Sequence, residues 1–152
     1  MKARVVIASD HGGYALKCEV VEWLRKDDWE VVDYGVHATD PVDYPDMALL
    51  VAQAVAHDSK ALGIVIDGAG IGSAITANKV PGVRAAPCFD TFTARNSREH
   101  NNANLLTLGG RVTGGGVAIE IVRTWLETAF AGGRHQRRVD KMLAVEARFL
   151  RS

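Results

Sequence analysis

The sequence is poor in several features that would point to a specialised environment. It contains two cysteines, four prolines and 7% aromatic residues, and its formal net charge is zero. Two cysteines, Cys18 and Cys88, cannot form a disulfide framework and match no metal-ligand spacing, so we expect reduced, buried thiols. Zero net charge gives no general attraction for nucleic acid or a membrane surface, and no apolar run is long enough to span a bilayer. We therefore expect neither of those partners.

The remaining bulk properties are those of an ordinary globular protein. The chain has 152 residues, of which 47% are apolar and 24% charged, which predicts one domain over residues 1–152. The segment that follows Met1 lacks the pattern of a secretory signal, so we expect a cytoplasmic protein. A near-neutral surface is also compatible with an oligomer, although it does not establish one.

Short apolar runs alternate with helix-compatible segments along the whole chain. The predicted strands are residues 4–9, 29–34, 61–66, 83–87 and 105–108. The predicted helices are residues 14–27, a segment opened by Pro45, residues 72–79, a segment capped by Asp90 that ends near His100, residues 115–130 and residues 139–150. This alternation predicts an α/β fold with a parallel sheet, in which the loops at the carboxyl ends of the strands form the ligand crevice.

The most informative loop follows the third predicted strand. Asp67 is followed by glycines spaced G-x-G-x-G over residues 68–72. A dinucleotide site wants G-x-G-x-x-G and a Walker loop wants Gly-Lys-Ser/Thr, so a nucleotide site is not supported. A site for a small anion or an oxyanion is favoured, with a glycine turn made only for packing as the alternative. Asp67 is then either a helix N-cap or a general base.

Three other polar segments allow two interpretations each. Asp10 and His11 could bind ligand hydroxyls or a phosphate, or form an Asx-turn with a surface histidine. His100 and the asparagines after it could polarise a sugar oxygen, or simply end a helix. The arginines of residues 134–138 could bind phosphate oxygens, or form a solvated basic turn.

Six motifs occur together and in order, at residues 10–17, 43–45, 68–79, 100–104, 109–114 and 132–138. The set resembles the ribose-5-phosphate isomerase B family, which is related to the galactose-6-phosphate isomerase subunits. The resemblance covers nearly the whole chain. It implies a Rossmann-like three-layer αβα sandwich with a five-stranded parallel sheet. It also implies a homodimer, or a dimer of dimers, with shared active sites and a C-terminal helix that packs on the partner subunit.

The resemblance implies an aldose–ketose isomerase of a phosphorylated sugar that uses no metal and no cofactor. The leading reaction, in the pentose phosphate pathway, converts ribose 5-phosphate to ribulose 5-phosphate through ring opening and a cis-enediolate. By match of motif, His100 would be the acid/base for ring opening, and Asp10 and Asn101 would bind sugar hydroxyls. The residues that would bind the enediolate, bind the phosphate or line the pocket are Gly68, Ala69, Gly70, Ile71, Gly72, Ser73, His11, Arg111, Arg134, Arg138 and Tyr44.

The chain departs from the family pattern at the proposed base. Many members carry a catalytic cysteine at the position of Asp67, and others carry a glutamate at the position of Ser73; Ala69 also stands where a hydroxyl residue is common. Asp67 could replace the cysteine as the base, because an ionised carboxylate accepts a proton without prior activation. Alternatively, the substrate could be a tetrose, hexose or unusual pentose phosphate, or the protein could bind a sugar phosphate without catalysis.

Overall fold

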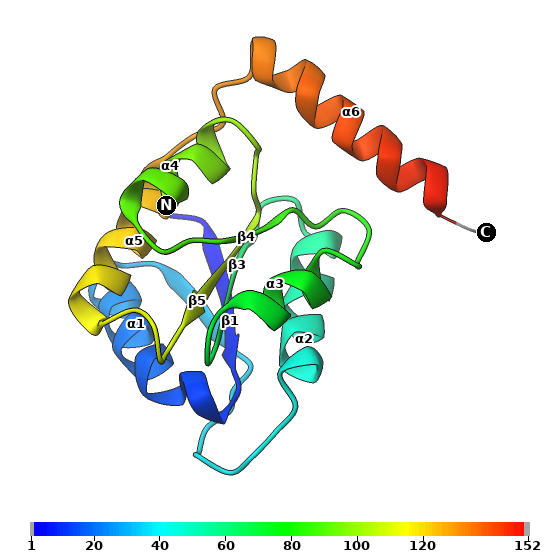
Figure 1. The fold of residues 1–152 in the computed structure, drawn as a ribbon. Helices are drawn as coiled ribbons and strands as arrows, with labels where there is room; N and C mark the ends of the chain where they lie inside the picture. Colours follow the sequence, from blue (N-terminus) through cyan, green and yellow to red (C-terminus); the bar gives the residue numbers. More distant parts are fainter. Residues whose placement is uncertain (1, 151–152) are drawn as a thin grey trace.

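The computed structural model describes residues 2–150, and a five-stranded parallel sheet forms its centre (Figure 1). The strands are β1 (Arg4–Ser9), β2 (Glu30–Asp33), β3 (Leu62–Asp67), β4 (Ala85–Pro87) and β5 (Leu105–Gly109), in the order β2-β1-β3-β5-β4. The three central strands are apolar and buried on both faces, as parallel strands between helical layers must be. The predicted parallel α/β sheet is confirmed.

Helices cover both faces of the sheet and complete three layers. One core forms where β1, β3 and β5 meet α1 (Tyr14–Lys26), α4 (Thr91–Glu99) and α5 (Gly115–Glu127). The other core forms between the opposite face and α2 (Tyr44–His57) with α3 (Ile71–Ala77). Trp125 of α5 is the largest fully buried side chain, and its indole N–H donates to the Ser97 hydroxyl of α4 at 3.1 Å. The Rossmann-like sandwich is thereby confirmed.

Helix α4 determines where the residues after it lie. The Asp90 carboxylate accepts from the Thr93 amide at 2.7 Å, which confirms Asp90 as its N-cap. The helix starts just beyond the end of β4 and runs back antiparallel to the strands. His100, at its C-terminus, therefore lies at the edge of the sheet where the strands begin. Asn104, just after it, accepts from the Gly63 amide at the start of β3.

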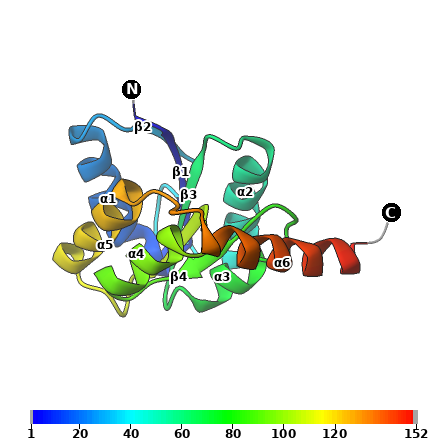
Figure 2. The same cartoon turned by 90° about the horizontal axis from the view of Figure 1, so that it is seen from above.

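The C-terminal helix differs from its prediction. Helix α6 is Arg134–Phe149 and begins five residues before the predicted residue 139. Gly132 and Gly133 both have positive φ, so the chain turns there and the helix starts at once behind them. The basic run that could have been a turn is the first turn of a helix. Figures 1 and 2 show α6 projecting away from the sandwich.

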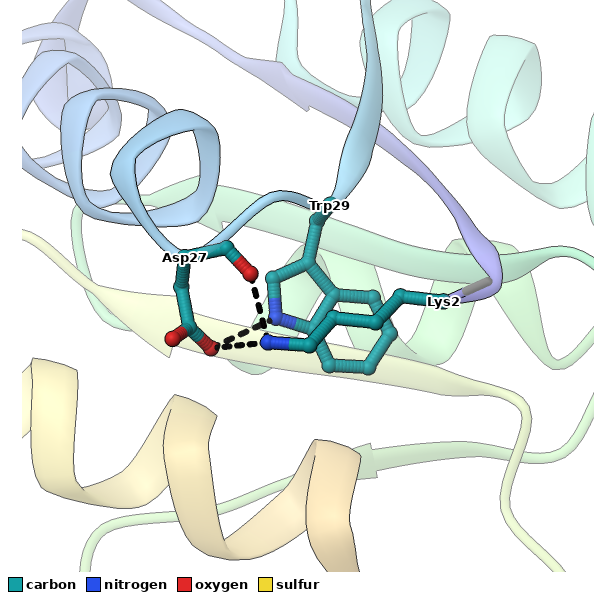
Figure 3. Close-up of polar contacts among 3 residues, drawn as sticks. All are labelled: Lys2, Asp27 and Trp29. Carbon is teal, nitrogen blue, oxygen red and sulfur yellow. Dashed lines mark hydrogen bonds and ion pairs between the residues drawn. The ribbon is translucent and has the colours of Figure 1, made fainter.

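A small polar cluster holds the start of β1 to the turn between α1 and β2. Figure 3 shows the Lys2 ammonium donating to the Asp27 carboxylate at 2.7 Å, while the Trp29 indole N–H donates to the same carboxylate at 3.1 Å. These two donors lower the pKa of Asp27 below its ordinary value. The cluster lies at the edge where the strands begin, away from the glycine loop.

Among residues 2–150, no helix combines the length and apolar composition needed to cross a membrane.

Candidate functional site

The loops after β1, β3 and β5 meet backbone to backbone at the carboxyl edge of the sheet. A Cβ at Gly13 would collide with the carbonyl of Ile66, and a Cβ at Gly109 would lie 2.7 Å from the carbonyl carbon of Ala69. Only glycine allows backbones to approach so closely at these two positions. The three loops therefore form one continuous floor, between strands whose order reverses at β1 and β3, where α/β folds bind ligands.

Asp67 stands at the centre of this floor and is 4% exposed. One carboxylate oxygen, Oδ1, accepts from the amides of Ala69, at 3.1 Å, and Gly70. The other, Oδ2, accepts from the Ser73 amide at 3.0 Å and the Ser73 hydroxyl at 2.6 Å. A carboxylate has about four lone-pair positions, so all of them are occupied. The N-cap of α3 is Gly70, so Asp67 is not the predicted helix N-cap and instead fixes the loop and Ser73 through these four bonds.

Ser73 belongs to this network rather than to the surface of the loop. Its side chain is fully buried and donates to Asp67, whereas Ala69 and Ile71 are exposed. The amides of Ile71 and Gly72 lie in the first turn of α3, where they have no helical acceptor. The loop therefore offers free amides on its outer side while Asp67 and Ser73 fix its inner side.

Asp10 and His11 come from the β1 loop and lie beside the glycine loop. Asp10 is buried, and its carboxylate accepts from the Gly13 amide at 3.0 Å, as in the predicted turn. The exposed His11 ring accepts from the Val42 amide through Nδ1 at 3.2 Å. The neutral ring then carries its proton on Nε2, which is free to donate to a ligand.

Tyr44 and Arg111 complete this edge. The Tyr44 ring occupies the space that a Cβ on Gly72 would need. Arg111 donates its amide to the Gly68 carbonyl at 3.0 Å, and its Cδ lies 3.7 Å from the position of a Cβ on Gly68. The structure thus brings together what we call the carboxyl-edge cluster: Asp10, His11, Tyr44, residues 67–73 and Arg111.

The other predicted site residues gather elsewhere, around the C-terminus of α4 and the N-terminus of α6. The His100 and His135 rings stack with centroids 4.0 Å apart and planes 14° apart. The Asn96 amide lies 3.1 Å from Nδ1 of His100, and the Glu99 carboxylate lies 3.5 Å from Nε2. These contacts fit a neutral His100 with its proton on Nε2. Asn101 also bonds Asn96, at 3.1 Å.

Positive charge collects on this second group. Arg134 and Arg138 are exposed and one helical turn apart, so they share a face of α6. Burial lowers the pKa of His135 below its ordinary value, and the nearby His100, Arg134 and Arg138 lower it further. We call His100, Asn101, Arg134, His135 and Arg138 the amino-edge cluster.

The two clusters lie at opposite edges of the sheet. Strand β3 separates the level of Gly63, next to Asn104, from Asp67. The four steps from Gly63 to Asp67 span about 13 Å at about 3.3 Å per residue. Asp67 and His100 of one chain therefore cannot contact the same small sugar phosphate.

Sequence reasoning assigned no role to two residues that contact His100 and misjudged one cysteine. His135 and Asn96 both contact His100, but of the residues near them only His100, Asn101, Arg134 and Arg138 were predicted as site residues. Cys88 is buried, and burial raises the pKa of its thiol. Cys18, predicted to be buried, is exposed instead, because it points away from the apolar stripe of α1. Residues 2–150 contain no cluster of three His, Cys, Asp or Glu side chains suited to a metal ion.

Comparison with known proteins finds relatives that match nearly the whole chain. The profile of the Ribose/Galactose Isomerase family matches residues 5–142. Ribose-5-phosphate isomerase B of Escherichia coli is 42% identical, over 95% of this chain and 97% of its own length. The structure of Clostridium thermocellum ribose-5-phosphate isomerase B superposes with a TM-score of 0.94 at 51% identity, over 97% of this chain and 99% of that one. That of the Mycoplasma genitalium enzyme with bound ribulose-5-phosphate gives 0.91 at 44%, over 95% and 96%.

The fold and these matches show that the protein is a sugar-phosphate aldose–ketose isomerase. Within that class, the chain belongs to the Ribose/Galactose Isomerase family.

Proposed function

We propose that this protein interconverts ribose 5-phosphate and ribulose 5-phosphate in an active site shared between two chains. The observation that carries the proposal is the separation of the two clusters. The carboxyl edge holds a buried acid and free loop amides, whereas the amino edge holds a histidine suited to ring opening and two arginines suited to phosphate. Neither half is sufficient alone, and a second copy would supply the missing half.

The proposed chemistry assigns one step to each half. His100 gives its Nε2 proton to the ring oxygen as the bond from C1 to that oxygen breaks, and Nε2 takes the proton of the anomeric hydroxyl in exchange. A base then removes the proton on C2, the electron pair forms the C1–C2 double bond, and the negative charge moves to O1, which gives the enediolate. The base returns the proton to C1 while the proton of O2 passes to O1, which gives the ketose, so no electrons or atoms are gained or lost. The free amides near Gly72 stabilise the enediolate.

The remaining roles follow from position. Asp10 and Asn101 bind sugar hydroxyls, and Tyr44 forms a wall of the pocket. Three arginines and the N–H of one histidine bind the phosphate. The phosphate-binding side chains are His11, Arg111, Arg134 and Arg138. Arginine forks match phosphate oxygens, and the Nε2–H of His11 adds a neutral donor.

Asp67 is the proposed base, and its hydrogen bonds set a condition on that role. To accept a proton, the carboxylate must release one of its four donors. Three of these are backbone amides, and only the Ser73 hydroxyl can turn away without moving the chain. The proton of C2 would then go to Oδ2, and Ser73 would return to that oxygen after each turnover.

Complementation between two inactive variants tests the shared site. Asp67→Asn and His100→Asn should each be nearly inactive alone. When the two are refolded together, half of the dimers formed by random pairing are mixed, and each contains one intact site. Activity should therefore return to about a quarter of the wild-type value. If the mixture stays as inactive as its components, both residues act within one chain and the shared site is wrong.

A second candidate, an isomerase of a different sugar phosphate, is favoured by Asp67 and Ala69, which replace the usual residues of the family pattern. Turnover should be measured on four-, five- and six-carbon aldose phosphates, together with exchange of the C2 hydrogen with solvent. The highest kcat/KM on ribose 5-phosphate supports the main proposal, and the highest value on another sugar supports the second candidate. Tight binding without C2 exchange would identify a protein that binds the sugar phosphate but does not isomerise it.

A further inference from the structure

Cationic side chains surround a cavity of about 450 Å³ at the edge of the sheet where the strands begin. Lys60, Arg84 and Arg98 line it together with Ser59 and Asn102, and no carboxylate is among the lining residues. No member of the carboxyl-edge or amino-edge cluster lines it either. The cavity is therefore separate from the residues assigned to isomerisation.

The two arginines are half-buried, and Arg98 also lies over the Trp125 ring, with its Cζ 5.0 Å from the ring centroid. Arg84 Nε donates to the Asn102 carbonyl at 2.7 Å, and Arg98 donates to the carbonyls of Ala103 and Thr128 at 2.5 and 3.1 Å. Carbonyl oxygens satisfy these N–H groups but carry no formal charge. None of the ion pairs among residues 2–150 involves Arg84, Arg98 or Lys60.

The electrostatics agree with the contacts. Burial lowers the pKa of both guanidinium groups, and repulsion from Arg84 lowers that of Arg98 further. The Glu146 carboxylate, which accepts from the Gly82 amide at 3.0 Å, acts on Arg84 in the opposite direction and offsets part of this effect. Asp58, next to Ser59, is 3.8 Å from Arg4. Burying charge without a counter-ion is costly, so an anion would stabilise this region.

The cavity also presents several donors that have no partner within residues 2–150. These are both terminal nitrogens of Arg84, one of Arg98, the Lys60 ammonium, the Asn102 amide and the Ser59 hydroxyl. Guanidinium and ammonium groups that line one cavity match the oxygens of a phosphate group. The volume exceeds that of inorganic phosphate, so there is room for a small organic group attached to it.

We propose that this cavity is a second anion site, which binds the phosphate group of a small phosphorylated metabolite. The site also adjoins the turn that carries His100 and Asn101, because Arg84 and Arg98 hold the carbonyls of the residues just after them. It does not depend on the proposed substrate of the isomerase.

Calorimetric titration of the full chain tests the site, with inorganic phosphate and glycerol 3-phosphate as separate probes. Arg134→Ala and Arg138→Ala are introduced into every sample, so that phosphate uptake at the proposed isomerase site does not contribute. We expect one phosphate per chain with Kd of about 1 mM or tighter. Tighter binding of glycerol 3-phosphate would identify an organic phosphate as the ligand, and tighter binding of inorganic phosphate would identify the free ion.

Variants at the rim of the cavity make the test specific. Lys60→Met should weaken phosphate binding about tenfold, since it removes a charged hydrogen-bond donor. Asn102→Gly removes the amide and suits the positive φ of that residue. Lys141→Met on the exposed face of α6 is the matched control for the loss of charge. Weakening in either rim variant, but not in Lys141→Met, supports the site. Equal weakening in the control, unchanged affinity in both rim variants, or no saturable binding overturns it.

Discussion

The carboxyl-edge cluster and the amino-edge cluster are built in different ways. The first is a backbone structure, in which three loops touch at glycines and Asp67 is held by four donors. The second consists of side chains on two helix ends, with stacked histidines and exposed arginines. A rigid floor suits a reaction that needs fixed donors near a developing charge, whereas long exposed arginines suit capture of a phosphate. In the proposed site, the rigid half would therefore stabilise the enediolate, and the exposed half would open the ring and help to hold the phosphate.

Asp67→Asn should have the largest effect on this comparison. If Asp67 is the base, turnover should fall by about 10²–10⁴, which is the usual contribution of a general base. Steady-state kinetics on ribose 5-phosphate would measure kcat, and circular dichroism with a thermal melt would show whether the fold is intact. Turnover close to the wild-type value would place the base elsewhere.

Asp67→Cys separates the base from the structural role of the same residue. A thiolate can accept the proton of C2, but one sulfur cannot replace two carboxylate oxygens that hold four donors. If proton transfer is the main role, the cysteine variant should keep far more turnover than Asp67→Asn. Equal loss in both variants would show that the chain needs the carboxylate chiefly to hold its loop.

Arg134→Ala should have a smaller effect, confined to binding. Removing one exposed guanidinium from the phosphate should raise KM for the phosphorylated sugar about tenfold and leave kcat nearly unchanged. KM for the unphosphorylated sugar should not change. Arg137→Ala, an equally exposed arginine on the same helix, is the control. Equal effects on both sugars, or equal effects of both variants, would remove Arg134 from the phosphate site.

His135 should produce the smallest effect, on the pH dependence of stability. Its pKa in the folded protein lies below the ordinary value of 6.5. The unfolded chain therefore binds a proton first as the pH falls. The stabilising contribution is complete above about pH 6.5 and is lost as the pH falls toward the folded-state pKa. His135→Phe keeps an aromatic ring against His100 but cannot titrate. Urea unfolding at about pH 7.5 and 5.5 should show a smaller loss of free energy in the variant, and equal losses would contradict the assignment.

Most of the sheet could be predicted because local signals agree with the fold. Strand β1 is a continuous run rich in β-branched residues, strand β5 is a short apolar run, and Asp90 caps α4 as its position before Thr91 suggests. The start of α6 could not be predicted, because Arg134–Arg138 lacks an apolar stripe and resembles a solvated turn. Only the backbone of Gly132 and Gly133 fixes the helix start there.

The candidate site was less accessible to sequence reasoning. The motifs identified residues of both clusters. No local sequence pattern, however, indicates that α4 places His100 at the opposite edge of the sheet from Asp67. The bond from Ser73 to Asp67 spans six residues and depends on the turn made by the intervening loop. The sequence allowed a cap or a base at Asp67, and the geometry adds that the base must first lose the Ser73 hydroxyl.

Helix α6 links stability to protein concentration in the proposed dimer. Val145 and Phe149 are exposed on it, Phe149 at 74%, and a partner chain that covers them would bind only the folded form. By mass action, dilution would then lower the melting temperature, and a titration of Tm against protein concentration would give the dimer dissociation constant. In the proposed dimer, the helix that contributes to the active site would thus also set the protein concentration below which the two chains dissociate.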